Sequence, residues 1–278
     1  MAKDFKRCND PDLYSATPPI EMLRMIVSIA ATGLSKNGTK RKIMVNDVAR
    51  AYFNAPNLTP VYVEICDEDR EAGDEEMCGE LLVSMYGTRP AASNWHTCYT
   101  KLLEDSGFIK SRASPCVFYH SIRDIDLIVH GDDFVSTGAE EDLQWLRVVF
   151  ETKFELSTDV IGPEEKDSKV VKVLNRIISV SEHGYTYEAD ARHAEIIIRD
   201  LGLSEAKGVS SPWSEEHFEE EELLDHERFK RYQSICARAN FLVLDRIDIQ
   251  FATKECCRSM AKPTITDWAR LKRLGDTL

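Results

Sequence analysis

Apolar residues recur with two periods along the chain. Helical spacing predicts helices at 20–31, 91–106, 140–150 and 189–201. Short apolar runs bounded by turn residues predict strands at 42–48, 60–65, 81–85, 116–119, 125–129, 134–136 and 170–180, the last pairing with 185–187. From Asp225 onward the pattern is helical in about three segments. Strands that follow one another as hairpins, with helices between and after them, predict an α+β fold with a helical C-terminal part.

Charge divides the chain into three parts. A mixed region covers 1–205, an acidic stretch that we interpret as a linker covers 206–224, and the helical segment covers 225–278. Over all 278 residues, 35 Lys and Arg stand against 48 Asp and Glu, a formal net charge of −13. A polyanionic partner is disfavoured by that balance unless basic residues gather locally, as they do at 36–42 and in the C-terminal segments.

Composition also bears on the compartment. No run of 18 apolar residues occurs and the N-terminus is charged, so we expect no membrane partner, no signal peptide and an intracellular protein, cytoplasmic or nuclear. The 8 cysteines include no C-x-x-C pair, which favours scattered reduced thiols over a zinc site or a disulfide framework.

The most unusual local feature is the run His130-Gly131-Asp132-Asp133, at the tip of a predicted hairpin. It could be an ordinary acidic turn, since Gly and Asp are common turn formers. Asp47 ends another predicted strand, and a sheet that placed this strand beside the hairpin would bring three carboxylates together. Oxygen ligands of this kind bind Mg²⁺, and two such ions can clamp the oxygens of a phosphoryl transfer. Spacing alone does not show that the strands are neighbours.

Several blocks, in order, resemble one known family. The stretch 47–54, with Asp47, an aromatic five residues later and then Asn54, resembles the first catalytic motif of copia-type LTR retrotransposon reverse transcriptases. Ser84-Met85-Tyr86-Gly87-Thr88-Arg89, followed by Trp95, resembles the second block of that family, and 130–133 occupies the place of its Tyr-x-Asp-Asp hairpin. Further resemblance lies upstream at 14–18 and downstream at 232–234, 246–249 and 268–273.

The resemblance implies a right-hand polymerase palm with an antiparallel sheet and flanking helices. Residues 1–205 would form this palm with partial fingers, and 225–278 would form a helical thumb or connection segment leading toward a missing ribonuclease H domain. The implied activity is RNA-directed DNA polymerisation, with an RNA or DNA template, a primer and deoxynucleoside triphosphates as partners. The rest of a pol polyprotein would be a further partner.

Roles carry over from the resemblance residue by residue. Asp47, Asp132 and Asp133 would be the catalytic carboxylates around two Mg²⁺ ions, or Mn²⁺, with one ion activating the primer 3′-hydroxyl and the other holding the triphosphate. Tyr52, Gly87 and Arg89 would bind the nucleotide, Tyr52 by excluding a 2′-hydroxyl. His130 and Gly131 would position the primer. Tyr52 could instead be a core aromatic and Arg89 an ordinary surface residue; Trp95 is expected to be core packing.

The sequence also departs from the family pattern. His130 stands where the family usually has Tyr or Phe, Gly131 where it has a small apolar residue, and Pro90 where it has Gln. A glycine within the hairpin strand is expected to weaken it. These departures, and the expected lack of fingers strands, leave an alternative open: a truncated, inactive retroelement remnant that keeps the palm fold and at most binds nucleic acid.

Overall fold

The computed structural model describes residues 13, 15–74, 76–189, 191–214 and 222–278. The chain forms two compact units, Met1–Val173 with Ser179–Thr186, and Leu174–Ile178 with Tyr187–Leu278. We describe each unit by itself.

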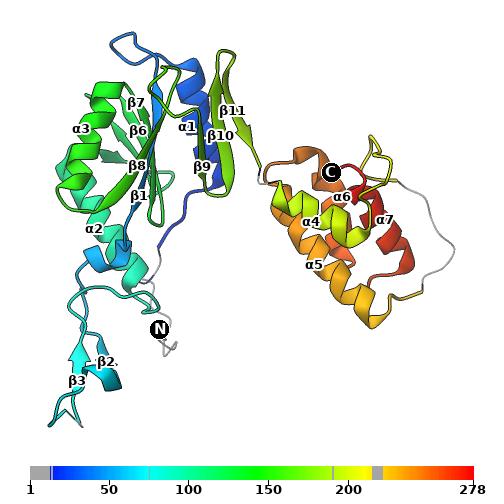
Figure 1. Ribbon diagram of the computed structural model, residues 1–278, viewed down its shortest axis with the longest axis horizontal. Helices are drawn as coiled ribbons and strands as arrows, with labels where there is room; N and C mark the ends of the chain where they lie inside the picture. Colours follow the sequence, from blue (N-terminus) through cyan, green and yellow to red (C-terminus); the bar gives the residue numbers. More distant parts are fainter. Residues whose placement is uncertain (1–12, 14, 75, 190, 215–221) are drawn as a thin grey trace. The chain divides into compact units, whose positions relative to one another are not determined.

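A six-stranded antiparallel sheet forms the centre of the first unit (Figure 1). Its strand order is β4-β5-β6-β7-β1-β8. The strands are β1 (Lys42–Val48), β4 (Ile109–Lys110), β5 (Val117–His120), β6 (Ile125–His130), β7 (Asp133–Gly138) and β8 (Leu156–Ile161). The chain therefore places β1 between the second strand of the β6–β7 hairpin and the later strand β8, a non-local pairing that no local pattern specifies.

Helices cover both faces of this sheet. One face packs against α2 (Ala91–Asp105) and α3 (Glu140–Glu151) in a core that includes Met44, Trp95 and Phe134. The other face contacts α1 (Ile20–Thr32), whose Leu23 and Ile26 are fully buried. Because successive residues of a strand point to opposite faces, β1 is buried on both sides over most of its length.

The remaining strands form two small sheets. A two-stranded arm joins β2 (Tyr62–Glu64) to β3 (Cys78–Glu80), and a three-stranded sheet has the order β11-β10-β9. The last three strands are β9 (Val170–Val173), β10 (Arg176–Ser181) and β11 (Gly184–Glu188).

The second unit is mainly helical. Its helices are α4 (Arg192–Leu201), α5 (His226–Leu242), α6 (Gln250–Arg258) and α7 (Ile265–Gly275), around a core that includes Tyr232 and Ile235. The Asp225 carboxylate accepts hydrogen bonds from the first-turn amides of α5, and Thr264 and Asp267 form a capping box on α7. In the part of the chain that the structure describes, no helix combines the length and the apolar character needed to cross a membrane.

The α+β prediction, with an antiparallel sheet, flanking helices and a helical C-terminal part, is confirmed. The strand predicted at 81–85 is wrong: this segment makes only an isolated bridge from Val83 to Pro56, and the strand precedes it in β3. The single strand predicted at 170–180 is two strands, because Leu174 and Asn175 adopt positive φ angles of 48° and 60° and turn the chain.

Candidate active site

Strand register brings the predicted carboxylates together. In the β1–β7 pair, Asp47 is the direct Cα partner of Asp133, and residues directly opposite on antiparallel strands project their side chains to the same face. The hairpin closes at the His130–Asp133 pair, so Asp132 lies in the two-residue turn. The Val48 amide donates to the Asp132 carbonyl at 3.1 Å, which ties that turn to the end of β1. Three carboxylates thus gather where β1 meets the hairpin tip.

The backbone conformation of the turn explains why residue 131 is a glycine. Gly131 has φ +66°, while Asp132 is not among the residues with positive φ, and a two-residue hairpin turn with positive φ at its first position favours glycine there. A Cβ built at Gly131 would meet nothing within 4 Å, so backbone conformation rather than crowding selects glycine. The expectation that Gly131 weakens a strand is wrong, because this residue lies in the turn.

The three carboxylates repel one another. Burial, together with the charges of Asp132 and Asp47, raises the pKa of Asp133 to about 6, against the smaller opposing effect of His130. Within the described residues none of the three makes an ion pair with Lys or Arg. Asp47 and Asp132 are exposed, and Asp133 is partly buried. The cluster therefore carries negative charge that the described side chains do not neutralise.

A divalent cation fits this donor set chemically. Carboxylate oxygens are the ligands that Mg²⁺ and Mn²⁺ prefer, and a cation would relieve the repulsion that adds to burial in raising the pKa of Asp133. Across the described ranges, no group of three or more His, Cys, Asp or Glu residues has the arrangement of a metal site. The backbone thus brings together three carboxylates that could hold a metal, and their side chains in this structure do not have the arrangement of a metal site.

Tyr52 lies beside the carboxylates on the short 3-10 helix η2 (Ala51–Asn54), which follows β1. Its ring centroid is 4.4 Å from that of Tyr86 in the second block, and its side chain packs against the sheet core. Burial, Tyr86 and the charge of Asp132 raise the pKa of Tyr52. The structure therefore combines the two interpretations of Tyr52, core packing and proximity to the carboxylates.

The second block reaches the same region through Tyr86. Gly87 is exposed with φ +94°, and the Thr88 hydroxyl donates to the Met85 carbonyl at 2.7 Å in the same turn. Arg89 is partly buried two residues before α2 begins. The structure brings the Tyr52 and Tyr86 rings together, and Gly87 and Arg89 follow Tyr86 in the same block.

Two contacts of α2 near the carboxylates are not predicted by the sequence. Trp95 is buried in the core as predicted, and its indole N–H also donates to the Gly131 carbonyl at 2.7 Å. Buried Asn94 donates to the Ser84 hydroxyl at 3.0 Å and to the Asn57 side chain at 3.2 Å. The one signal in the sequence is an Asn next to a Trp in a predicted helix. This pair does not show which groups accept hydrogen bonds from the two side chains.

The basic run 36–42 is a poorer polyanion site than predicted. Arg41 is buried and pairs with Asp124 at 2.8 Å and Asp126 at 2.7 Å. Lys42 is buried and pairs with Glu140, Glu164 and Asp167. These two cations neutralise carboxylates of the protein, because both project inward from the end of β1.

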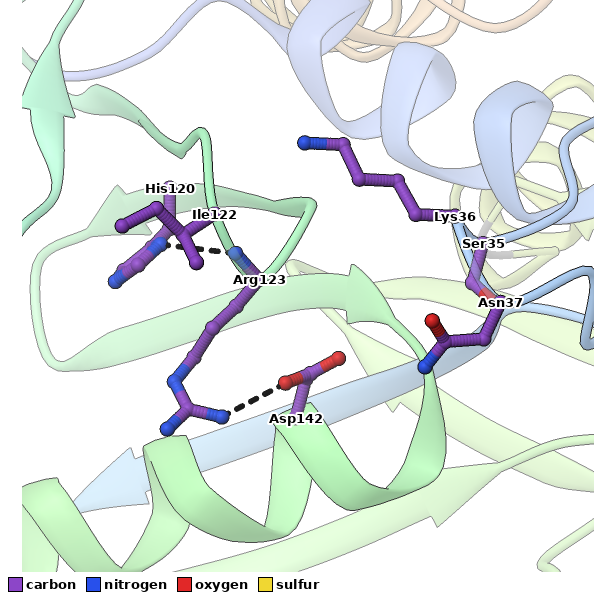
Figure 2. Close-up of a pocket in the computed structure, with 7 residues that line it drawn as sticks. All are labelled: Ser35, Lys36, Asn37, His120, Ile122, Arg123 and Asp142. Atoms are coloured by element: carbon purple, nitrogen blue, oxygen red, sulfur yellow. Dashed lines mark hydrogen bonds and ion pairs between the residues drawn. The ribbon is translucent and has the colours of Figure 1, made fainter.

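A surface pocket lies at the other end of the hairpin (Figure 2). It is lined by Ser35, Lys36, Asn37, His120, Ile122, Arg123 and Asp142. Arg123 pairs with Asp142 at 2.8 Å, and its backbone N–H donates to His120 Nδ1 at 3.2 Å, so the pocket's polar groups bind one another (Figure 2). Residues 120–123 precede β6, whereas His130 ends it, and the pocket is therefore separate from the carboxylates.

Comparison with known proteins supports the motif interpretation. The family model described as reverse transcriptase (RNA-dependent DNA polymerase) matches residues 1–214. The chain is 22% identical over 211 residues to the retrovirus-related Pol polyprotein from transposon TNT 1-94 of Nicotiana tabacum, covering 72% of this chain and 14% of that protein. It is 25% identical over 148 residues to an uncharacterized mitochondrial protein of Arabidopsis thaliana, covering 53% and 58% of the two chains.

The similarity of this chain to solved structures is weaker. Telomerase from Candida albicans, solved with a fragment of telomeric RNA, aligns with a TM-score of 0.35 and 8% identity, covering 92% of this chain and 48% of the telomerase chain. The telomerase of Candida tropicalis aligns with a TM-score of 0.34 and 11% identity, covering 94% and 42%. These scores add nothing to the fold assignment, which rests on the family model and on the sheet described above. With most of its length matched by that model, the chain belongs to the reverse transcriptase (RNA-dependent DNA polymerase) family.

Proposed function

We propose that this chain is an RNA-directed DNA polymerase domain of a retrotransposon, which extends a primer 3′ end on an RNA or DNA template with deoxynucleoside triphosphates. The observation that supports it best is the β1–β7 register, which sets Asp47 opposite Asp133 with Asp132 in the adjoining turn. An ordinary acidic turn would need no third carboxylate from a distant strand. Membership of the reverse transcriptase family supports the proposal that polymerase chemistry takes place at this cluster.

Each site residue then has a proposed role. Asp47, Asp132 and Asp133 would hold two Mg²⁺ ions, with Mn²⁺ as a substitute; bound there, the ions would polarise the primer 3′-hydroxyl and neutralise the triphosphate. Tyr52, whose ring packs at a tilt of 32° against that of Tyr86, would exclude a 2′-hydroxyl from the sugar site. The backbone of Gly87 and the Arg89 cation would contact the nucleotide. His130, at the end of β6, and Gly131, in the turn, would position the primer end.

The remaining assignments concern the domains. Residues 1–205 would be the palm with partial fingers, 206–224 a linker, part of which lies outside the described residues, and 225–278 the helical thumb or connection segment. The chain spans 14% of the tobacco polyprotein and 58% of the Arabidopsis protein. The rest of a pol polyprotein is a further partner under this proposal.

The experiment is extension of an oligo(dT) primer on poly(rA) with Mg²⁺ or Mn²⁺, comparing the purified chain with Asp132→Asn and with Asp126→Asn. Asp126 pairs with Arg41 away from the hairpin tip, so it controls for the loss of a carboxylate from the same sheet. We expect extension by the parent chain and by Asp126→Asn, and none by Asp132→Asn. Equal extension by Asp132→Asn would refute the assignment of the carboxylates.

A second candidate function has its own observation. The described residues hold no group of three ligands arranged for a metal, which favours a remnant that keeps the palm fold and at most binds nucleic acid. A chain that is folded by circular dichroism, binds a labelled primer–template in a gel-shift assay and extends nothing with either metal would establish this second function.

A further inference from the structure

One face of α2 donates hydrogen bonds to all three segments of the proposed site. Trp95 donates to the hairpin turn at Gly131. Asn94, its neighbour, donates to Ser84 at the start of the second block, and Cys98, one turn later, donates its thiol to the Asn54 carbonyl at 3.5 Å, at the end of the Tyr52 helix. The spacing of these donors along the helix therefore sets the spacing of segments that are far apart in the sequence.

Trp95 makes the most specific of these contacts. Its side chain is 2% exposed, and edge-to-face contacts with Tyr99, Phe134 and Phe154 hold its ring at centroid distances of 5.5, 6.2 and 5.0 Å. The 2.7 Å distance from Nε1 to the Gly131 oxygen is short for an N–H donor. A ring fixed on several sides offers its N–H in one direction only, so the Gly131 carbonyl has one preferred position.

That carbonyl belongs to the peptide that leads into Asp132. The next peptide is held by β1, because the Asp132 carbonyl accepts a hydrogen bond from the Val48 amide at 3.1 Å. Asp132 therefore lies between two anchored carbonyls, one bound by α2 and one by β1. Without the Trp95 contact, the turn would be held by the His130–Asp133 strand pair and the Val48 amide, and the Gly131 carbonyl would lose its anchor.

We propose that Trp95 is a positioning residue of the polymerase site, whose indole N–H fixes the Gly131 carbonyl and thereby sets Asp132 and Asp133 for metal binding. This inference rests on the proposed function, since it assigns what positions the metal-binding carboxylates. A purely apolar role for Trp95 would require ring packing alone and no donor. The two roles differ in a property that can be measured: the metal affinity of a folded variant that lacks only the N–H.

The test compares Trp95→Phe with Trp145→Phe. Trp145 is a matched control because it also packs against the sheet core, with its ring 4.0 Å beneath the Arg123 guanidinium, and donates nothing to the hairpin turn. Mn²⁺ affinity is measured by electron paramagnetic resonance, with Asp132→Asn to define binding at this site. We expect Trp95→Phe to weaken Mn²⁺ binding about fivefold to tenfold, the usual range for one lost hydrogen bond, and Trp145→Phe to leave it unchanged.

Hydrogen exchange at the Val48 amide provides a second readout without metal. Because this amide is bound to the Asp132 carbonyl, a loosened turn should speed its exchange about fivefold in Trp95→Phe and not in Trp145→Phe. If Trp95→Phe does not fold, β-(3-benzothienyl)alanine at position 95 keeps the ring shape and replaces the N–H by sulfur, and the same two changes are expected.

The outcomes separate the two proposals. A folded Trp95→Phe with parent Mn²⁺ affinity and parent Val48 exchange overturns the positioning role. A parent chain that binds Mn²⁺ no better than Asp132→Asn overturns it too, together with the proposed metal site. A parent chain that binds Mn²⁺ through Asp132 and extends no primer refutes the polymerase proposal only, and the effect of Trp95→Phe on Mn²⁺ affinity then still decides the positioning role.

Discussion

The two ends of β1 carry carboxylate clusters that differ in whether a cation of the protein balances their charge. At the first end, the Lys42 amine lies among Glu140, Glu164 and Asp167 at 3.0, 3.2 and 2.8 Å, and its side chain is 3% exposed. Burial alone would lower the pKa of Lys42, but hydrogen bonds to the three carboxylates raise it overall. At the second end, Asp47 faces Asp133 with Asp132 beside them, and no described Lys or Arg side chain pairs with any of the three.

The difference teaches how to separate a carboxylate cluster that stabilises the fold from one that is proposed to bind a cation on the same strand. Carboxylates that surround a buried cation stabilise the fold by neutralising it. Carboxylates that gather without one cost free energy until a cation arrives from solution, and burial together with the charges of Asp132 and Asp47 raises the pKa of Asp133 accordingly. Acidic content alone does not distinguish the two ends.

The largest effect is expected at the balanced end. Lys42→Met removes the cation and leaves Asp167, whose side chain is 4% exposed, as an uncompensated buried charge. We expect the free energy of unfolding to fall by about 3 kcal/mol, since breaking a buried ion pair strands its partner. Urea unfolding at pH 7 measures this fall.

Lys166 is the control for Lys42, because it pairs with two of the same carboxylates, Glu140 and Glu164, from a side chain that is 61% exposed. Lys166→Met should change the unfolding midpoint far less than Lys42→Met, since solvent screens its pairs. Similar losses in the two variants would show that burial of Lys42 is not what makes the cluster stabilising.

The next effect tests the unbalanced end and has the opposite sign. Asp133→Asn removes one of the repelling charges, so it should stabilise the metal-free fold at pH 8 by about 2 kcal/mol. The folded pKa of about 6 lies above the unfolded value near 3.8. The protonated carboxyl therefore favours folding below pH 3.8, and that advantage is lost as the pH rises through 6.

Unfolding curves of the parent chain and Asp133→Asn in EDTA, between pH 4 and 8, measure this dependence. The stability difference should shrink as the pH falls from 8 toward 4, because the parent carboxyl becomes neutral too. A destabilising effect of Asp133→Asn at pH 8 would mean that the Asp133 carboxylate is bound by favourable contacts rather than strained by its neighbours.

The smallest effect sharpens the comparison by supplying the cation. Mg²⁺ at ten times its dissociation constant should stabilise the parent chain by about 1.4 kcal/mol, and Asp132→Asn much less. Thermal melts with increasing Mg²⁺ at pH 8 measure this, with Ca²⁺-free buffer and NaCl of matched ionic strength as the control. Equal Mg²⁺ stabilisation of Asp132→Asn would place the ion elsewhere on this acidic surface.

Local pattern predicted much of the fold. The strand at 42–48 has the predicted bounds, and the helices at 20–31, 91–106 and 140–150 differ from α1, α2 and α3 by one residue at one end. Apolar spacing is a local property and needs no knowledge of neighbours. The edge strand β8 was missed because its residues are half-buried and include Ser157, Thr158 and Asp159, which are also typical of loops.

For the candidate site, the sequence by itself determined which residues are proposed to carry the chemistry: the Asp47 block, the second block and the acidic hairpin stand in the order of the family they resemble. The sequence also predicted the hairpin turn that contains Gly131. Only the tertiary structure decided that Asp47 faces Asp133 and that Trp95 binds the Gly131 carbonyl. It also decided that Lys42 is a buried ion-pair partner and no surface cation. The physical reason is the sequence distance over which each property is set. Residue type and spacing express local preferences, whereas strand register and buried hydrogen bonds depend on which distant segments the core brings together.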